Sequence, residues 1–185
     1  MKGERGDWIQ TFTGRQFWPI APAVDEVEIE DIAHALSMLC RFGGHCLRFY
    51  SVAEHSVLLA RHVAPEHALW ALLHDASEAY LVDIPRPLKP YLAGYREAED
   101  AIMAVICQRF GLPEGMPVAV KLADTAILSD EAEQNMAPPP VAWSTTTAPL
   151  GVELKFWSPA LAKYKFLQAF HTHRRAALAA AERSE

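Results

Sequence analysis

Apolar residues recur at intervals of three and four positions through much of the chain, as they do on the buried face of a helix. The first such run contains Ile29, Ile32, Ala33, Leu36 and Leu39. The glycine pair at 43–44 follows this run and is typical of a helix end. The pattern predicts a helix over residues 28–41.

Start and stop signals indicate the next helices. Ser51 with Glu54 three residues later forms a capping box, which predicts a helix through His62. Pro65 opens another helix, which we expect to end near Asp83 because the proline at 85 disfavours helical backbone at the residue before it.

The second half of the chain adds further helical segments. We expect helices over 95–110, closed by Gly111, and over 117–135. The Pro-rich and Thr-rich stretch within 136–157 predicts a loop or surface lid. The pair Ser158-Pro159 then starts a last helix over 158–183.

The pattern as a whole predicts one all-α domain over residues 1–185, with an irregular or short-stranded arm at 1–27. A chain of this length can bury roughly 70% of the surface that its unfolded form exposes, so a single core is expected. No apolar run approaches the ~20 residues of a membrane span, and the first residues lack the pattern of a secretory signal. We therefore expect a cytoplasmic protein without a membrane partner.

Charge and cysteine content restrict the function further. The formal net charge of −6, without a dense basic run, argues against nucleic acid as a partner. A small anionic substrate remains compatible, because a metal and nearby cations can reverse the local potential. Cys40, Cys46 and Cys107 show no paired spacing, so we expect free buried thiols.

Ionisable residues within apolar segments are the candidates for chemistry. His74 and Asp75 lie in an apolar run, where a buried charge without a partner costs several kcal/mol, of order 3–5. Glu78 follows at helical spacing and falls on the same side. Together these three residues predict a site.

His55 and Asp124 are each a single ionisable residue in an apolar helix, and either one alone is more typical of a core residue with a satisfied partner. With His74 and Asp75 they supply two imidazoles and two carboxylates from separate helices. This mixed nitrogen and oxygen set is typical of a hydrolytic transition-metal site.

The order of His55, the pair His74-Asp75 and the distant Asp124 resembles the HD-domain phosphohydrolases, which are helical bundles with a metal site between helices. The flanking sequences resemble the subgroup of bacterial 5'-deoxynucleotidases and phage dATP triphosphohydrolases. They are Ser-Val-Ala-Glu-His-Ser at 51–56, His-Asp-Ala-Ser-Glu at 74–78, Asp-Ile-Pro at 83–85 and Leu-Ala-Asp-Thr at 122–125.

The resemblance implies a role for each matching residue. The metal ligands would be His55, His74, Asp75 and Asp124. The ion would be Mn, Co, Zn, Fe or Ni, with Mg as an additional ion. Glu78 would act as the acid/base group, and Asp83 would bind the sugar or assist a second metal. The substrate contacts would be Arg41 on phosphate, Phe42 on the nucleoside, His45 and Lys89.

The resemblance also implies an activity, which is attack of metal-bound water on the phosphorus of a 2'-deoxyribonucleotide. The substrate would be a monophosphate, as for a 5'-nucleotidase, or a triphosphate, as for a dATPase. Two alternatives remain open: a non-catalytic regulator that binds metal and nucleotide, and a di-iron HD-type oxygenase, for which His45 would be a spare ligand. Homo-oligomers are expected by resemblance.

Overall fold

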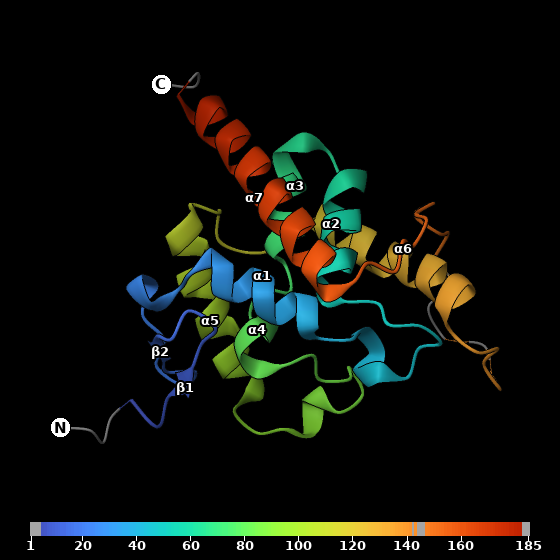
Figure 1. Ribbon diagram of the computed structural model, residues 1–185, viewed down its shortest axis with the longest axis horizontal. Coiled ribbons are helices and arrows are strands. Elements are labelled where there is room, and N and C mark those ends of the chain that lie inside the picture. The colour runs from blue at the N-terminus through green and yellow to red at the C-terminus, as the bar shows by residue number, and fades with distance from the viewer. Residues whose placement is uncertain (1–4, 142, 144–146, 183–185) are drawn as a thin grey trace.

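The computed structural model describes residues 5–141, 143 and 147–182 (Figure 1). It is mainly helical, as the apolar spacing predicts. The first four residues of the expected arm, residues 142 and 144–146 of the expected lid, and residue 183 lie outside the described part. Among the described helices, none combines the length and the apolar character that a membrane crossing requires.

Helix α2, Val52–His62, lies at the centre of the fold. Every side chain from Val52 to Ala60 is buried, including Glu54 and His55. Its neighbours are α1 (Ile29–Met38), α3 (Ala68–Leu73), α6 (Val118–Asn135) and α7 (Pro159–Ala181) (Figure 1). A polar residue within 52–60 therefore has no access to bulk water and must find its partners inside the protein.

The later helices begin and end close to the predicted positions. Helix α5 spans Tyr95–Phe110, and Gly111 closes it with a left-handed φ of 72°, a conformation that glycine adopts without strain. The prediction for 117–135 is confirmed by α6. Helix α7 begins as expected, because the hydroxyl of Ser158 accepts a hydrogen bond from the backbone N–H of Leu161.

The N-terminal arm contains the short strands that its sequence allows. Strands β1 (Ile9–Gln10) and β2 (Gln16–Phe17) pair antiparallel, with Ile9 opposite Phe17. A 3-10 turn, η1 (Val24–Glu26), leads from the hairpin toward α1. Phe17 is fully buried and stacks on Tyr80 with ring centroids 3.8 Å apart, so this pair attaches the hairpin to the core.

Helix α1 ends at Met38, so the predicted helix over 28–41 is too long. Cys40 instead forms a bridge with Ser51, and the N–H of Arg41 donates to the carbonyl of Tyr50 at 2.9 Å. Arg41 begins the 3-10 turn η2 (Arg41–Gly44). The backbone at 39–40 is extended rather than helical, because it pairs with residues 50–52 just before and at the start of α2.

The helix expected to run from Pro65 to near Asp83 is divided. A 3-10 turn, η3 (Pro65–His67), precedes α3, which ends at Leu73. Tight turns cover 74–77, and α4 (Glu78–Leu81) follows until Val82, whose φ is 63°. His74 and Asp75 therefore lie just beyond a helix rather than within one. A last 3-10 turn, η4 (Lys89–Tyr91), precedes α5.

Residues 150–157, which we call the strap, are held against α2 and α6. The carboxylate of Asp130 accepts backbone N–H groups of residues 150–152. The carboxylate of Glu54 accepts those of residues 155–157 at 2.6–2.9 Å. The described residues of this segment form neither helix nor strand, as the loop prediction requires, and two buried carboxylates fix the backbone of its second part.

The three cysteines are free thiols, and only Cys107 is buried. Cys40 and Cys46 are half-buried, with their sulfur atoms 3.5 Å apart. The expectation that all three thiols are buried is therefore wrong for two of them.

Candidate metal centre

Three of the four expected metal ligands meet between α2, the turn after α3, and α6. The Nε2 atoms of His55 and His74 lie 3.3 Å apart. Oδ1 of Asp124 lies 3.4 Å from the first of these atoms and 3.6 Å from the second. These side chains are far apart in the sequence, and their donor atoms form one compact triangle.

Asp75 lies beside this triangle. Its Oδ2 is 3.2 Å from Nε2 of His74 and 3.8 Å from Nε2 of His55. A metal with bonds of about 2.1 Å holds adjacent ligand atoms about 3.0–3.4 Å apart, by simple tetrahedral or octahedral geometry. The ligand atoms of His55, His74 and Asp124 thus have a spacing close to that around a small divalent ion, and Asp75 lies beside them. We call these four side chains the metal cluster.

The other nitrogen of each imidazole has its own partner. Nδ1 of His55 lies 2.6 Å from Oε1 of Glu131, and Nδ1 of His74 lies 2.8 Å from the carbonyl of Ala71. Both partners are acceptors, so each Nδ1 carries the proton and each Nε2 presents a lone pair. Two lone pairs 3.3 Å apart repel each other unless a cation or a proton lies between them.

The electrostatics of the metal cluster also favour positive charge. Burial acts to lower the pKa of His74, but Asp75 and Asp124 outweigh it and raise that pKa well above its usual value. Burial acts to raise the pKa of Asp124, but the two imidazoles outweigh burial and lower that pKa. Burial acts to raise the pKa of Asp75, but His74 outweighs burial and lowers that pKa to about 2. Such a site attracts a proton or a metal ion.

Arg41 lies next to the metal cluster, and Glu131 connects the two. The buried guanidinium places Nη2 3.0 Å from Glu131 and Nη1 3.5 Å from Asp75. Burial acts to lower the pKa of Arg41, but the carboxylates of Glu131 and Asp75 outweigh burial and raise that pKa well above its usual value. Nε of Arg41 is buried without a hydrogen-bond partner in the described part of the chain.

Glu131 is a site residue that our sequence reasoning missed. It is fully buried and contacts both His55 and Arg41. A signal was available, because Glu131 follows Asp124 by seven residues, which is two helical turns on the same face.

Glu78 and Asp83 have the environment of proton-transfer groups. Burial, with Asp75 and Asp83, raises the pKa of Glu78 to about 9. Its Oε2 is buried and has no hydrogen-bond partner among the described residues. Burial also raises the pKa of the half-buried Asp83. At neutral pH, without a metal, Glu78 therefore carries its proton.

The remaining predicted substrate contacts lie farther out. Phe42 is half-buried, and the Arg41 guanidinium lies 5.4 Å from its ring centroid. Nζ of Lys89 donates a hydrogen bond to Glu99 at 2.8 Å. The positive charge of Lys89 also acts to lower the pKa of Glu78, against the larger effect of burial. His45 is exposed. The substrate roles of Phe42, His45 and Lys89 stay predictions.

Comparison with known proteins finds relatives in bacteria. The chain is 48% identical over 124 residues to the uncharacterized protein YfdR of Escherichia coli K12, an alignment that covers 67% of this chain and 70% of YfdR. It is 39% identical over 141 residues to an uncharacterized protein of Rhodobacter capsulatus, covering 69% and 72% of the two chains. No family model matches the chain.

Proposed function

Since this chain belongs to the family of YfdR, we propose that it is a divalent-metal-dependent phosphohydrolase of the HD-domain type that acts on 2'-deoxyribonucleotides. The observation that carries the proposal is the pair of buried Nε2 atoms 3.3 Å apart, with Asp75 and Asp124 beside them. Buried imidazoles arranged in this way are more typical of a metal site than of a core. The resemblance of the flanking sequences supports the choice of substrate.

His55, His74, Asp75 and Asp124 would hold the ion. When bound, such an ion supplies Lewis acidity, which lowers the pKa of water and polarises a phosphoryl oxygen. Glu131 and the carbonyl of Ala71 would keep both imidazoles in the required tautomer and orientation.

The protein's own groups would handle the remaining charge and the proton. Arg41 would bind a phosphate oxygen through the part of its guanidinium that Glu131 and Asp75 leave free, and its Nε is one such donor. Glu78, whose Oε2 has no hydrogen-bond partner among the described residues, would act as the acid/base group and give a proton to the leaving oxygen. Asp83 would contact the sugar or a second ion.

The substrate would be a deoxynucleoside monophosphate or triphosphate. Phe42, next to Arg41 in the turn η2, would pack on the nucleoside. Lys89 and His45 would add contacts to a longer phosphate chain. Assembly into homo-oligomers belongs to the same proposal.

The test is hydrolysis by metal-loaded protein of a panel of deoxynucleotides and ribonucleotides, as monophosphates and triphosphates. Mn, Co, Zn and Mg are compared, and products are separated by chromatography. We expect Glu78→Gln to lower kcat by about 10²–10⁴-fold while the metal content stays the same. Glu97→Gln, on an exposed carboxylate of α5, is the matched control.

Well-folded, metal-loaded protein that leaves every nucleotide intact would overturn the proposal. A non-catalytic regulator would then be favoured if nucleotides bind, and an oxygenase if the protein holds two coupled irons. Equal activity of Glu78→Gln and the wild type would overturn the assigned role of Glu78 alone.

A further inference from the structure

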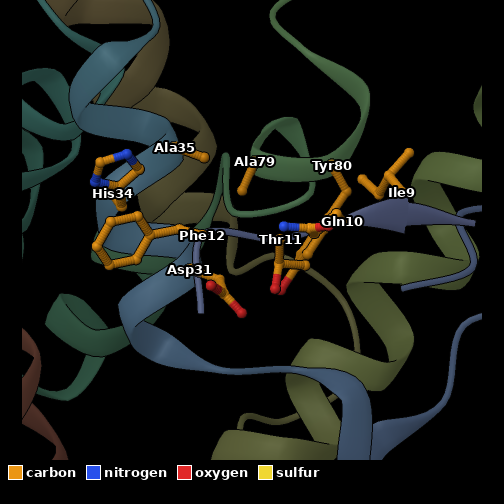
Figure 2. Close-up of a pocket in the computed structure, with 9 residues that line it drawn as sticks. All are labelled: Ile9, Gln10, Thr11, Phe12, Asp31, His34, Ala35, Ala79 and Tyr80. Carbon is orange, nitrogen blue, oxygen red and sulfur yellow. The ribbon is translucent and has the colours of Figure 1, made fainter. Parts of the chain in front are cut away.

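A pocket of about 290 Å³ lies between the N-terminal hairpin, α1 and α4, apart from the metal cluster (Figure 2). Its polar groups include Thr11, Asp31 and Tyr80, and Phe12 and Ala79 supply part of its apolar wall. Figure 2 shows the side chains of Asp31 and Thr11 directed toward the same part of the pocket. Nothing in the proposed hydrolysis uses these residues.

Asp31 is a buried carboxylate without a cation. It is 3% exposed and accepts two hydrogen bonds, both from Thr13, at 2.7 Å from the backbone N–H and 3.0 Å from the hydroxyl. Within the described part of the chain, no Lys, Arg or His forms an ion pair with it. Buried charges in proteins are normally paired, and a carboxylate has lone pairs for about two more donors.

Tyr80 is the second incompletely bonded group. It is 8% exposed, and its hydroxyl forms no full hydrogen bond among the described residues, although the backbone of Glu28 lies close enough to lower its pKa. Burial, and next the charge of Asp31, raise the pKa of this hydroxyl. Because the ring is stacked on Phe17, the hydroxyl is held in place. Buried hydroxyl groups usually find a partner, and the residue that carries this one lines the pocket.

The nearby basic groups contact an aromatic ring instead of Asp31. His34 stacks on Phe12 with centroids 3.8 Å apart, as Figure 2 shows. Nζ of Lys163 lies 3.9 Å from the Phe12 centroid. These contacts hold Phe12 as a wall of the pocket, and no basic residue in the described ranges forms an ion pair with Asp31.

We propose that this pocket binds a small organic amine as its ammonium cation. The ammonium group donates to Asp31 and to the hydroxyl of Tyr80, and the apolar part lies against Phe12 and Ala79. An anionic ligand would be repelled by Asp31. The volume is near the lower end of the roughly 300–1,000 Å³ of ligand pockets, so the ligand is small.

The test is calorimetric titration of the full chain with 2-phenylethylamine near pH 7. The matched probes are 2-phenylethanol, which is neutral, and phenylacetate, which is anionic. We expect saturable binding of the amine and binding at least about tenfold weaker for the other two, because only the amine forms charge-assisted hydrogen bonds. Asp31→Asn should weaken amine binding about tenfold or more, and Asp100→Asn, an exposed carboxylate on α5, should not.

Asp31→Asn also disturbs the contact with Thr13, so a second variant keeps the test independent of folding. Tyr80→Phe preserves the stacking on Phe17 and should weaken the amine about two- to tenfold. The proposal is overturned, and the pocket is only a water-filled cavity, if the amine does not saturate the wild type up to about 10 mM. Equal affinity of the wild type, Asp31→Asn and Tyr80→Phe also overturns it.

Discussion

Glu54 and His55 are neighbours on α2, and both are fully buried, yet their surroundings differ. The Glu54 carboxylate accepts three backbone N–H groups of the strap, so its negative charge is met by fixed donors. His55 faces another imidazole at 3.3 Å, with two aspartate carboxylates nearby. The first polar contact is complete within the protein, and the second needs a proton or a cation between the two imidazoles.

The difference separates two reasons for burying a polar group. A carboxylate with all its partners in the chain stabilises one fold and has no capacity for a ligand. The metal cluster, with Arg41 and Glu78 beside it, keeps buried donors and acceptors unused. Unsatisfied groups that converge are therefore a better indication of function than burial alone.

The largest expected effect is the loss of the Glu54 contact. Glu54→Ala leaves three backbone N–H groups without their acceptor, and each such loss costs about 1–3 kcal/mol. We expect the free energy of unfolding in urea to fall by about 3–5 kcal/mol. Metal bound per folded molecule should stay constant below the unfolding transition.

Glu153→Ala is the matched control, because this strap residue is exposed and pairs with Lys155 at the surface. Its effect should stay within about 0.5 kcal/mol. A loss of less than about 1 kcal/mol in Glu54→Ala would show that the strap is not an anchor.

A smaller effect is expected from Glu131, which contacts the metal cluster without belonging to it. Glu131→Gln replaces the charged acceptor of the His55 Nδ1 hydrogen bond with a neutral amide, which orients the imidazole less firmly. We expect it to lower metal affinity about 10–100-fold. Competition with a chelator measures this, with Glu133→Gln, exposed on the same helix, as control. Unchanged metal affinity in Glu131→Gln would contradict the orienting role.

A further expected effect is a pH dependence of stability in the metal-free protein. Folding raises the pKa of Glu78 from 4.5 to about 9, so the folded state keeps a proton that the unfolded state loses. The stability that Glu78 contributes is fully present below pH 4.5 and decreases as pH rises toward about 9.

From pH 5 to pH 9, the Tm of the wild type should therefore fall relative to the Tm of Glu78→Gln. Thermal melts in chelator measure it. A constant difference across this range would mean that the folded pKa of Glu78 is not raised.

Local signals in the sequence predicted most of the helices. The helix over 95–110, its end at Gly111, and the start at Ser158 depend on nearest neighbours, and the structure has them as expected. The early end of α1 could not be predicted in this way. The apolar spacing continues through Leu39, but the backbone at Cys40 pairs with Ser51, a contact between separate segments.

The candidate site shows the same limit. The single residues His55, His74, Asp75 and Asp124 stood out because they are ionisable within apolar segments, and the structure brings them together. Glu131 and Asp31 did not stand out, because one acidic residue on a helix is usually solvated. Only the tertiary arrangement shows that these two are buried.

The strap has a consequence for how the chain is made. Its N–H groups lie 101–103 residues after Glu54. At about 5–20 residues per second, a ribosome adds the strap roughly 5–20 s after it adds Glu54. During that interval the Glu54 carboxylate stays hydrated and α2 cannot bury all its faces. The central helix, and the metal cluster that it carries, thus take final form only after the strap has been synthesised.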